Sequence, residues 1–165
     1  SHFDPARRSP TRVSTPSTPC PRTSPRTPED EAMLRLYDYL PSGNGYKVRL
    51  VLAQLGIPYE LVELDIVKGE TRTPEFLAKN PNGRIPVLEV EPGKCLAESN
   101  AILAYVSEGT PFLPDDRWLR AQVLQWMCFE QYSHEPNIAT VRFWITHHVE
   151  MTPERVAAMP GKRGN

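Results

Sequence analysis

The stretch NPNGRIPVLEV, residues 80–90, places a proline where a strand should begin. Pro86 has no amide hydrogen, and proline is therefore excluded from the middle of a sheet. A short apolar run nevertheless follows it within residues 85–90, and a second run over 94–97 comes after a Glu-Pro-Gly turn at 91–93. The turn chemistry predicts a hairpin whose first strand is entered through a proline.

The residues upstream alternate between strand and helix patterns. Polar and apolar residues alternate over 33–39, as in a half-buried strand. The period then becomes helical over 46–56, and Gly56 closes that helix. Residues 59–66 are a second predicted strand, which should run parallel to the first through a right-handed crossover.

Two further helices complete this unit. Thr73 is a plausible N-cap with Pro74 at the first helical position, which predicts a helix over 73–80. Another helix is predicted over 98–109, after the hairpin. The predicted order is strand, helix, strand, helix, strand, strand, helix, so the fold class is α/β.

Beyond the linker at 110–116 the composition becomes all-helical. A stripe of apolar residues at helical spacing contains Leu119, Val123, Trp126 and Met127. Pro136 should kink this helix, because it removes a backbone hydrogen bond, and a Thr-Pro cap at 152–153 restarts a helix. One amphipathic helix and the start of another cannot fully bury each other's apolar faces. We therefore expect residues 117–165 to be an incomplete all-helical domain.

The N-terminal residues have a different composition. Residues 1–30 hold seven of the 18 prolines and few large apolar side chains. Such a segment cannot bury enough surface to offset the entropy of ordering, so residues 1–32 are predicted to be a disordered Ser/Thr/Pro-rich tail. This tail is either a docking or phosphorylation segment or, more simply, a spacer or translated upstream sequence.

Composition excludes several classes of protein. The formal net charge is −1, which argues against nucleic acid and anionic membranes as partners. Cys20, Cys95 and Cys128 lack disulfide or zinc spacing, and we expect Cys95 and Cys128 to be small buried hydrophobic residues. The four histidines suggest no metal site, since His147 and His148 should point in different directions. Without a membrane-length apolar run or a signal peptide, the chain reads as cytoplasmic.

Five stretches together resemble the glutathione S-transferase family. They are SGNGYKVRL (42–50), GIPYELVELDI (56–66), TPEFLAKNPNGRIPVLEV (73–90), ESNAILAYV (98–106) and TPFLP (110–114). The likeness is closest to bacterial members of the theta-, beta- and nu-like group. It implies a thioredoxin-like glutathione-binding domain at 33–110, a helical domain after it, and a homodimer.

The resemblance implies a role for Pro86 in binding the ligand. It implies a cis Ile85–Pro86 bond, which turns the backbone of Val87 outward to pair with the cysteinyl part of glutathione. A plain tight turn before an edge strand is the alternative. Arg84 is a candidate for binding the glycyl carboxylate, with Lys47 in reserve, although a solvated side chain is the more common fate of a loop arginine.

The next helix should hold the γ-glutamyl end of the tripeptide. Ser99 is well placed as an N-cap, and free amides with the positive end of the helix dipole favour an anion there. In the family the acid at Glu98 takes the ammonium, and the hydroxyl of Ser99 with the amides takes the carboxylate. Capping alone would explain the same residues.

The thiol of glutathione should lie at Ser42 and Asn44. A hydroxyl that donates to sulfur favours the thiolate, the reactive form, and Ser42 matches the serine of theta-like relatives, while Asn44 could donate from its amide. Both are also good turn residues. Related bacterial loops often have cysteine where Gly45 stands, so thiol chemistry by the protein itself is not expected.

Two functions remain open. One is a glutathione transferase that conjugates the thiolate of glutathione, its co-substrate, to a small hydrophobic electrophile. The other is a non-catalytic or incomplete module for glutathione binding or assembly.

Overall fold

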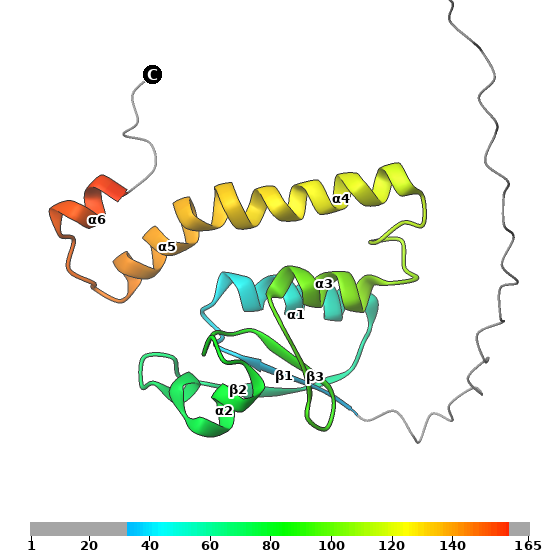
Figure 1. The fold of residues 1–165 in the computed structure, drawn as a ribbon, viewed down its shortest axis with the longest axis horizontal. Coiled ribbons are helices and arrows are strands. Elements are labelled where there is room, and N and C mark those ends of the chain that lie inside the picture. The colour runs from blue at the N-terminus through cyan, green and yellow to red at the C-terminus, as the bar shows by residue number, and fades with distance from the viewer. Residues whose placement is uncertain (1–32, 159–165) are drawn as a thin grey trace, which may run out of the picture. The chain divides into compact units, whose positions relative to one another are not determined.

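The computed structural model describes residues 33–158, so the predicted tail at 1–32 lies outside the described residues. Figure 1 shows a small sheet flanked by helices, followed by a longer helical stretch. In this described part no helix is long and apolar enough to cross a membrane.

The sheet has four strands in the order β2-β1-β3-β4. The strands are β1 (Leu34–Asp38), β2 (Tyr59–Glu63), β3 (Val87–Glu91) and β4 (Lys94–Ala97). Strands β1 and β2 are parallel, whereas β3 runs antiparallel to both β1 and β4. The predicted parallel pairing of the first two strands and the predicted hairpin are both confirmed, and β1 lies inside the sheet.

Three helices and a short 3₁₀ turn accompany the strands, and the last of these helices follows β4. They are α1 (Gly43–Leu55), the 3₁₀ turn η1 (Glu70–Arg72), α2 (Pro74–Lys79) and α3 (Ser99–Ser107). Gly56 ends α1 with φ 66°, a left-handed conformation that glycine adopts without steric cost. Thr73 caps α2, since its hydroxyl accepts a hydrogen bond from the amide of Phe76 at 3.3 Å. Both ends were predicted from the sequence.

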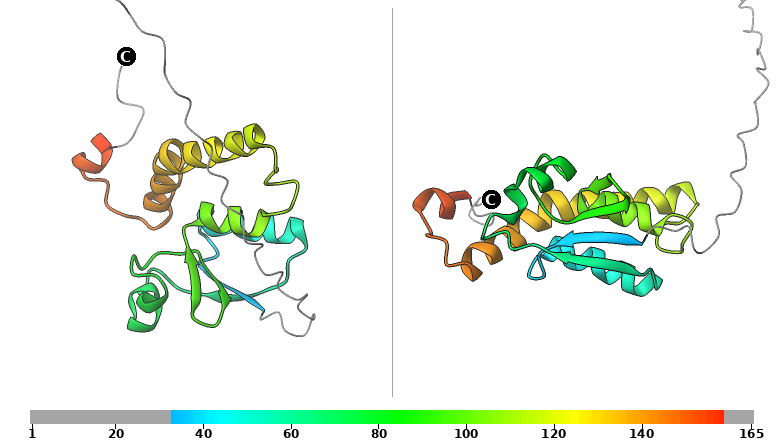
Figure 2. Two further views of the ribbon diagram at one scale, coloured as in Figure 1. Left: turned by 45° about the vertical axis from the view of Figure 1, so that its right-hand side comes forward. Right: turned by 90° about the horizontal axis from the view of Figure 1, so that it is seen from below.

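Alternation along the strands separates two apolar clusters. Leu36 and Leu88 pack with Val48 of α1 and Ile102 of α3. The neighbouring strand residues Tyr37 and Val87 pack with Phe76 of α2 instead. Because successive strand side chains point to opposite faces, α1 and α3 cover one face of the sheet and α2 covers the other (Figures 1 and 2).

The helical stretch after residue 116 is interrupted where the sequence predicted a kink. Helix α4 (Arg117–Phe129) passes into five residues of π-helix, η2 (Glu130–His134), and then into α5 (Glu135–Thr146). Pro136 lies in the first turn of α5, directly after this irregular turn. A last helix, α6 (Pro153–Ala158), begins after Thr152, whose hydroxyl accepts from the amide of Arg155 at 3.4 Å.

The predicted apolar stripe is present but not buried. No residue of α4 or α5 is buried in the described part of the chain. Leu119 and Trp126 are exposed, and Val123 and Met127 are only half-buried.

Two sequence predictions about individual residues are wrong. Glu98, not Ser99, is the N-cap of α3; it has φ 70° and makes no capping bond with its side chain. Ser99 is instead the first helical residue, and its hydroxyl donates to Asn44 Oδ1 of α1 rather than capping α3. Cys128 is exposed on α4 and Cys95 is partly exposed, so neither is a fully buried residue.

Candidate functional site

The site begins at the N-terminus of α1. Ser42 has extended backbone angles and caps the helix, and its Oγ accepts from the amide of Gly45 at 3.3 Å. Helix α1 therefore starts three residues earlier than its apolar spacing predicts, which brings Asn44 into the first turn. The first amides of a helix lack partners within the helix, and the dipole is positive there, so this end favours an anion.

A buried carboxylate lies beneath this helix end. Asp38 is fully buried and pairs with Arg49, which also donates to the carbonyl of Leu40 at 2.9 Å. A Cβ at position 45 would come within 1.8 Å of Asp38 Oδ1. Gly45 therefore leaves the space that the carboxylate occupies, and a cysteine at that position would not fit without displacing it.

The N-terminus of α3 meets that of α1. The buried Ser99 hydroxyl donates to Asn44 Oδ1 at 3.3 Å, across 55 positions of sequence. Glu98 precedes it with an exposed side chain. The structure thus brings Ser42, Asn44, Glu98 and Ser99 to two adjoining helix ends.

The strand entry has the predicted cis Ile85–Pro86 bond. Val87 has Tyr37 of β1 on one side and Ala97 of β4 on the other. The amide and carbonyl of one residue in an antiparallel strand point to the same side. Those of Val87 therefore point toward β1 or toward β4, and on both sides a strand already lies next to Val87. Ile85 lies outside the sheet ladder.

The two basic candidates differ in their surroundings. Arg84 is exposed, and its backbone carbonyl accepts from Asn80 Nδ2 at 2.8 Å. Lys47 forms an ion pair of 2.6 Å with Glu130 of η2. The structure therefore gives Lys47 a role in attaching the helical stretch to α1.

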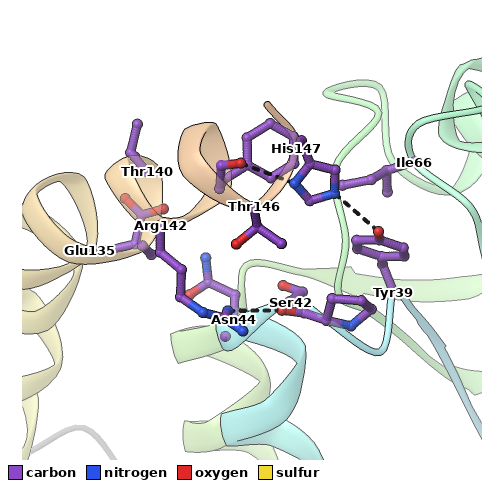
Figure 3. Close-up of a pocket in the computed structure, with 13 residues that line it drawn as sticks. Tyr39, Ser42, Asn44, Ile66, Glu135, Thr140, Arg142, Thr146 and His147 are labelled. Atoms are coloured by element: carbon purple, nitrogen blue, oxygen red, sulfur yellow. Dashed lines mark hydrogen bonds between the residues drawn. The ribbon is translucent and has the colours of Figure 1, made fainter. Parts of the chain in front are cut away.

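A cavity of about 210 Å³ lies beside the α1 end (Figure 3). One wall is formed by residues 39–44 and the other by α5 with His147. Its lining residues are Tyr39, Pro41, Ser42, Gly43, Asn44, Ile66, Glu135, Ala139, Thr140, Arg142, Phe143, Thr146 and His147. Ser42 and Asn44 are predicted site residues. The lining does not include the other predicted residues, which are Arg84, Ile85, Pro86, Val87, Glu98 and Ser99.

Among the polar residues of this cavity that sequence reasoning missed, two lie within hydrogen-bonding distance of each other. The Tyr39 hydroxyl and His147 Nε2 are 3.1 Å apart, although 108 positions separate them in sequence. The His147 ring stacks on Phe143 with centroids 4.1 Å apart. No local pattern marks either residue, because their proximity depends on how α5 packs against the end of β1.

A second polar cluster lies near α2. Buried Glu89 accepts from the Tyr37 hydroxyl at 2.6 Å, from the amide of Gly93 at 2.8 Å and from Lys79 at 3.0 Å. These hydrogen bonds, that of Tyr37 first, lower the pKa of Glu89 to about 2. Burial, followed by the bond to Glu89, raises the pKa of Tyr37. The donors to Glu89 all belong to the sheet, its hairpin turn or α2. The cluster therefore has a structural role, which is to join α2 to the sheet.

The comparisons with known proteins agree with this geometry. Residues 32–108 match the family model of the glutathione S-transferase N-terminal domain. The crystal structure of a possible glutathione S-transferase from Rhodopseudomonas palustris has 57% identity and a TM-score of 0.67, over 68% of this chain and 55% of that one. A structure of Ure2p in complex with glutathione has 32% identity and a TM-score of 0.64, over 75% and 55% of the two chains.

A curated relative is similar as well. The transcriptional regulator URE2 of Saccharomyces cerevisiae is 37% identical over 133 residues, which are 73% of this chain and 37% of the relative. The chain thus spans little more than a third of that regulator's length.

The mixed four-stranded sheet, with helices on both faces and a proline at the entry to β3, defines a thioredoxin-like domain. Residues 32–108 match the N-terminal domain of the glutathione S-transferase family, and glutathione S-transferases are among the solved structures that this chain resembles.

Proposed function

We propose that this protein binds glutathione at the adjoining N-termini of α1 and α3 and presents its thiolate to the cavity against α5. The observation that carries this proposal is the meeting of Ser42, Asn44 and Ser99 beside that cavity. Helix N-termini favour anions, and glutathione supplies both a carboxylate and a thiolate. The likeness to Ure2p solved with glutathione supports the choice of ligand.

The hydrogen bonds already present leave the thiolate donors free. Ser42 Oγ accepts from Gly45, so its own hydrogen remains available for sulfur. Asn44 uses its Oδ1 to accept from Ser99, which leaves its amide NH₂ to donate. Both donors stabilise the charged form of the thiol, whose ordinary pKa of about 8.5 leaves it mostly protonated in neutral solution.

We assign the rest of the tripeptide to the elements next to the N-terminus of α1. Glu98 takes the ammonium, while the first amides of α3 take the γ-glutamyl carboxylate. The Ser99 hydroxyl turns from Asn44 to that carboxylate when glutathione binds, which leaves the Asn44 amide NH₂ still free to donate. The backbone of Ile85 pairs with the cysteinyl residue, because Val87 is flanked by strands on both sides. Pro86 places the backbone of Ile85 just before β3, where no strand in the described part of the chain pairs with it. Arg84 binds the glycyl carboxylate. We further propose, from the family, that the protein conjugates glutathione to an electrophile as a cytoplasmic homodimer.

A second function has its own support. Ser42 and Asn44 have capping and bridging roles that are sufficient to explain them without catalysis. The curated URE2 relative is named a transcriptional regulator. A glutathione-binding module without turnover is therefore the alternative.

Calorimetry and turnover assays separate the two functions. Ser99→Ala and Glu98→Ala should weaken glutathione binding, whereas Glu108→Ala, at the opposite end of α3, should not. Ser42→Ala should keep the affinity but lower conjugation by about tenfold to a hundredfold, since a charge-assisted hydrogen bond contributes roughly 1.5–3 kcal/mol. Binding without turnover would select the module. A chain that gives no heat with millimolar glutathione would contradict both functions.

A further inference from the structure

The cavity wall opposite Ser42 is rich in polar groups. Thr140, Arg142 and Thr146 of α5 line it together with Tyr39 and His147. In Figure 3 Thr146 projects into the space between His147 and Asn44. Arg142 already donates to the carbonyl of Pro41 at 3.2 Å, and Tyr39 and His147 are bonded to each other. A co-substrate that carries an oxygen acceptor would gain hydrogen bonds from the threonine and tyrosine hydroxyls of this wall, whereas an apolar electrophile would not.

The hydrogen bonds of His147 fix its protonation pattern. Its Nδ1 lies 3.0 Å from the backbone carbonyl of Phe143, and a carbonyl can only accept. Nδ1 therefore carries a hydrogen, and in the neutral ring Nε2 accepts from the Tyr39 hydroxyl. In the charged ring Nε2 also carries a hydrogen and donates to the Tyr39 oxygen. The phenol hydrogen is then free to turn into the cavity.

We propose that Tyr39 and His147 form a proton relay for a co-substrate that carries a carbonyl group conjugated to a carbon–carbon double bond. The inference rests on the proposed binding of glutathione. The thiolate sulfur bonds to the β-carbon, and the electron pair of the double bond moves to give an enolate. Tyr39 donates its proton to the enolate and receives one from His147 Nε2. The adduct ends with that proton on its α-carbon.

The charges and atoms balance over one cycle. The thiol of glutathione loses a proton to water when the thiolate forms. Half-buried His147 regains one from water after the relay. A displacement that expels a chloride ion needs no proton at this point, so the relay distinguishes two classes of electrophile.

The test uses the 165-residue chain with glutathione and two electrophiles. Crotonaldehyde takes up a proton on addition, whereas 1-chloro-2,4-dinitrobenzene expels chloride. Tyr39→Phe and His147→Gln should each lower the crotonaldehyde rate by about tenfold to a hundredfold, the usual contribution of general acid catalysis. Their rates with the aryl chloride and their heats of glutathione binding should stay within about twofold of wild type.

The solvent isotope effect separates a relay from a packing role. The wild-type crotonaldehyde rate should fall in heavy water more than the aryl chloride rate does, because only the first reaction needs a proton from the relay, and His147→Gln should remove that difference. The other charged groups of the cavity are Glu135 and Arg142, both on α5; Tyr39 faces His147 from the end of β1, and Ile66 is apolar. Tyr46→Phe, on the exposed part of α1, and His148→Asn are matched controls that should change neither rate.

Each outcome has a distinct meaning. Glutathione binding and aryl chloride turnover with an unchanged crotonaldehyde rate in both variants would overturn the relay alone. Equal losses with the two electrophiles would also overturn it, because they would indicate a general packing defect. A wild-type chain that binds glutathione but converts neither electrophile refutes the relay, and one that binds no glutathione refutes the proposed function itself.

Discussion

Single residues near the sheet have roles that their hydrogen bonds define. Glu89 receives hydrogen bonds from Tyr37, Gly93 and Lys79, and its side chain is almost fully buried. All of these donors stabilise the charged carboxylate, which is why its pKa falls to about 2. A carboxylate whose pKa is lowered by folding stabilises the folded state at pH values above its ordinary pKa.

Glu89→Gln should therefore lower stability in a pH-dependent way. The contribution of Glu89 is complete above about pH 4.5 and is lost as the pH falls toward about 2. In neutral solution the variant should be less stable by roughly 2–3 kcal/mol. The two unfolding curves, measured with urea, should converge near pH 2. A difference that is constant with pH would show that Glu89 contributes through packing instead.

Gly45 offers a test of the space under α1. Gly45→Ala places a methyl group against the Asp38 carboxylate, and overpacking of this kind costs about 1–3 kcal/mol. Gly43→Ala is the matched control, because nothing lies within 4 Å of its Cβ position. Thermal unfolding should show a lower melting temperature for the first variant only. Two equal melting temperatures would mean that Asp38 moves aside freely.

At the scale of elements, the sequence was informative wherever a local pattern decided the structure. The parallel β1 and β2, the Thr73 cap and the hairpin all follow from periodicity and turn chemistry. The N-cap of α3 did not, since Glu98 occupies that position without a capping bond and the Ser99 hydroxyl instead contacts a distant helix, which no local pattern indicates. Likewise, no local signal pairs Tyr39 with His147, because that contact exists only after α5 has packed.

Asn100 forms one of the hydrogen bonds that attach α4 to the thioredoxin-like unit; another joins Arg120 to Glu108. Asn100 Nδ2 of α3 donates to the carbonyl of Met127 at 2.7 Å. Asn100→Ala should increase amide hydrogen exchange at the end of α4 and in η2 by about fivefold, as expected for a loss of about 1 kcal/mol. Exchange in β1 and β3 should not change. Equal exchange in both proteins would assign the attachment to the Lys47–Glu130 ion pair.

At the scale of the whole molecule, the helical stretch presents a large apolar surface. Trp126 is 65% exposed, Phe129 52% and Leu119 49%. Each large apolar side chain left in water forgoes about 1.5–3 kcal/mol, which is a sizeable share of the stability of a domain. A surface of this kind promotes association.

The 165-residue chain should therefore bind a hydrophobic fluorescent dye and associate as its concentration rises. Leu119→Lys with Trp126→Lys should reduce both effects, whereas Val67→Lys, at an equally exposed position after β2, should reduce neither. Dye fluorescence and sedimentation velocity provide the two measurements. A monomer that ignores the dye would show that these side chains cover one another in solution.

The two walls of the cavity come from parts of the chain that are far apart in sequence. Residues 39–44 form the wall proposed to hold the reactive end of glutathione, and residues 135–147 form the opposite wall. Under the proposed function, substitutions on the second wall should change the preference for the electrophile while the contacts to the tripeptide stay the same. The two walls can therefore be recombined between related proteins, and α5 is the helix to exchange when a protein with a different electrophile preference is sought.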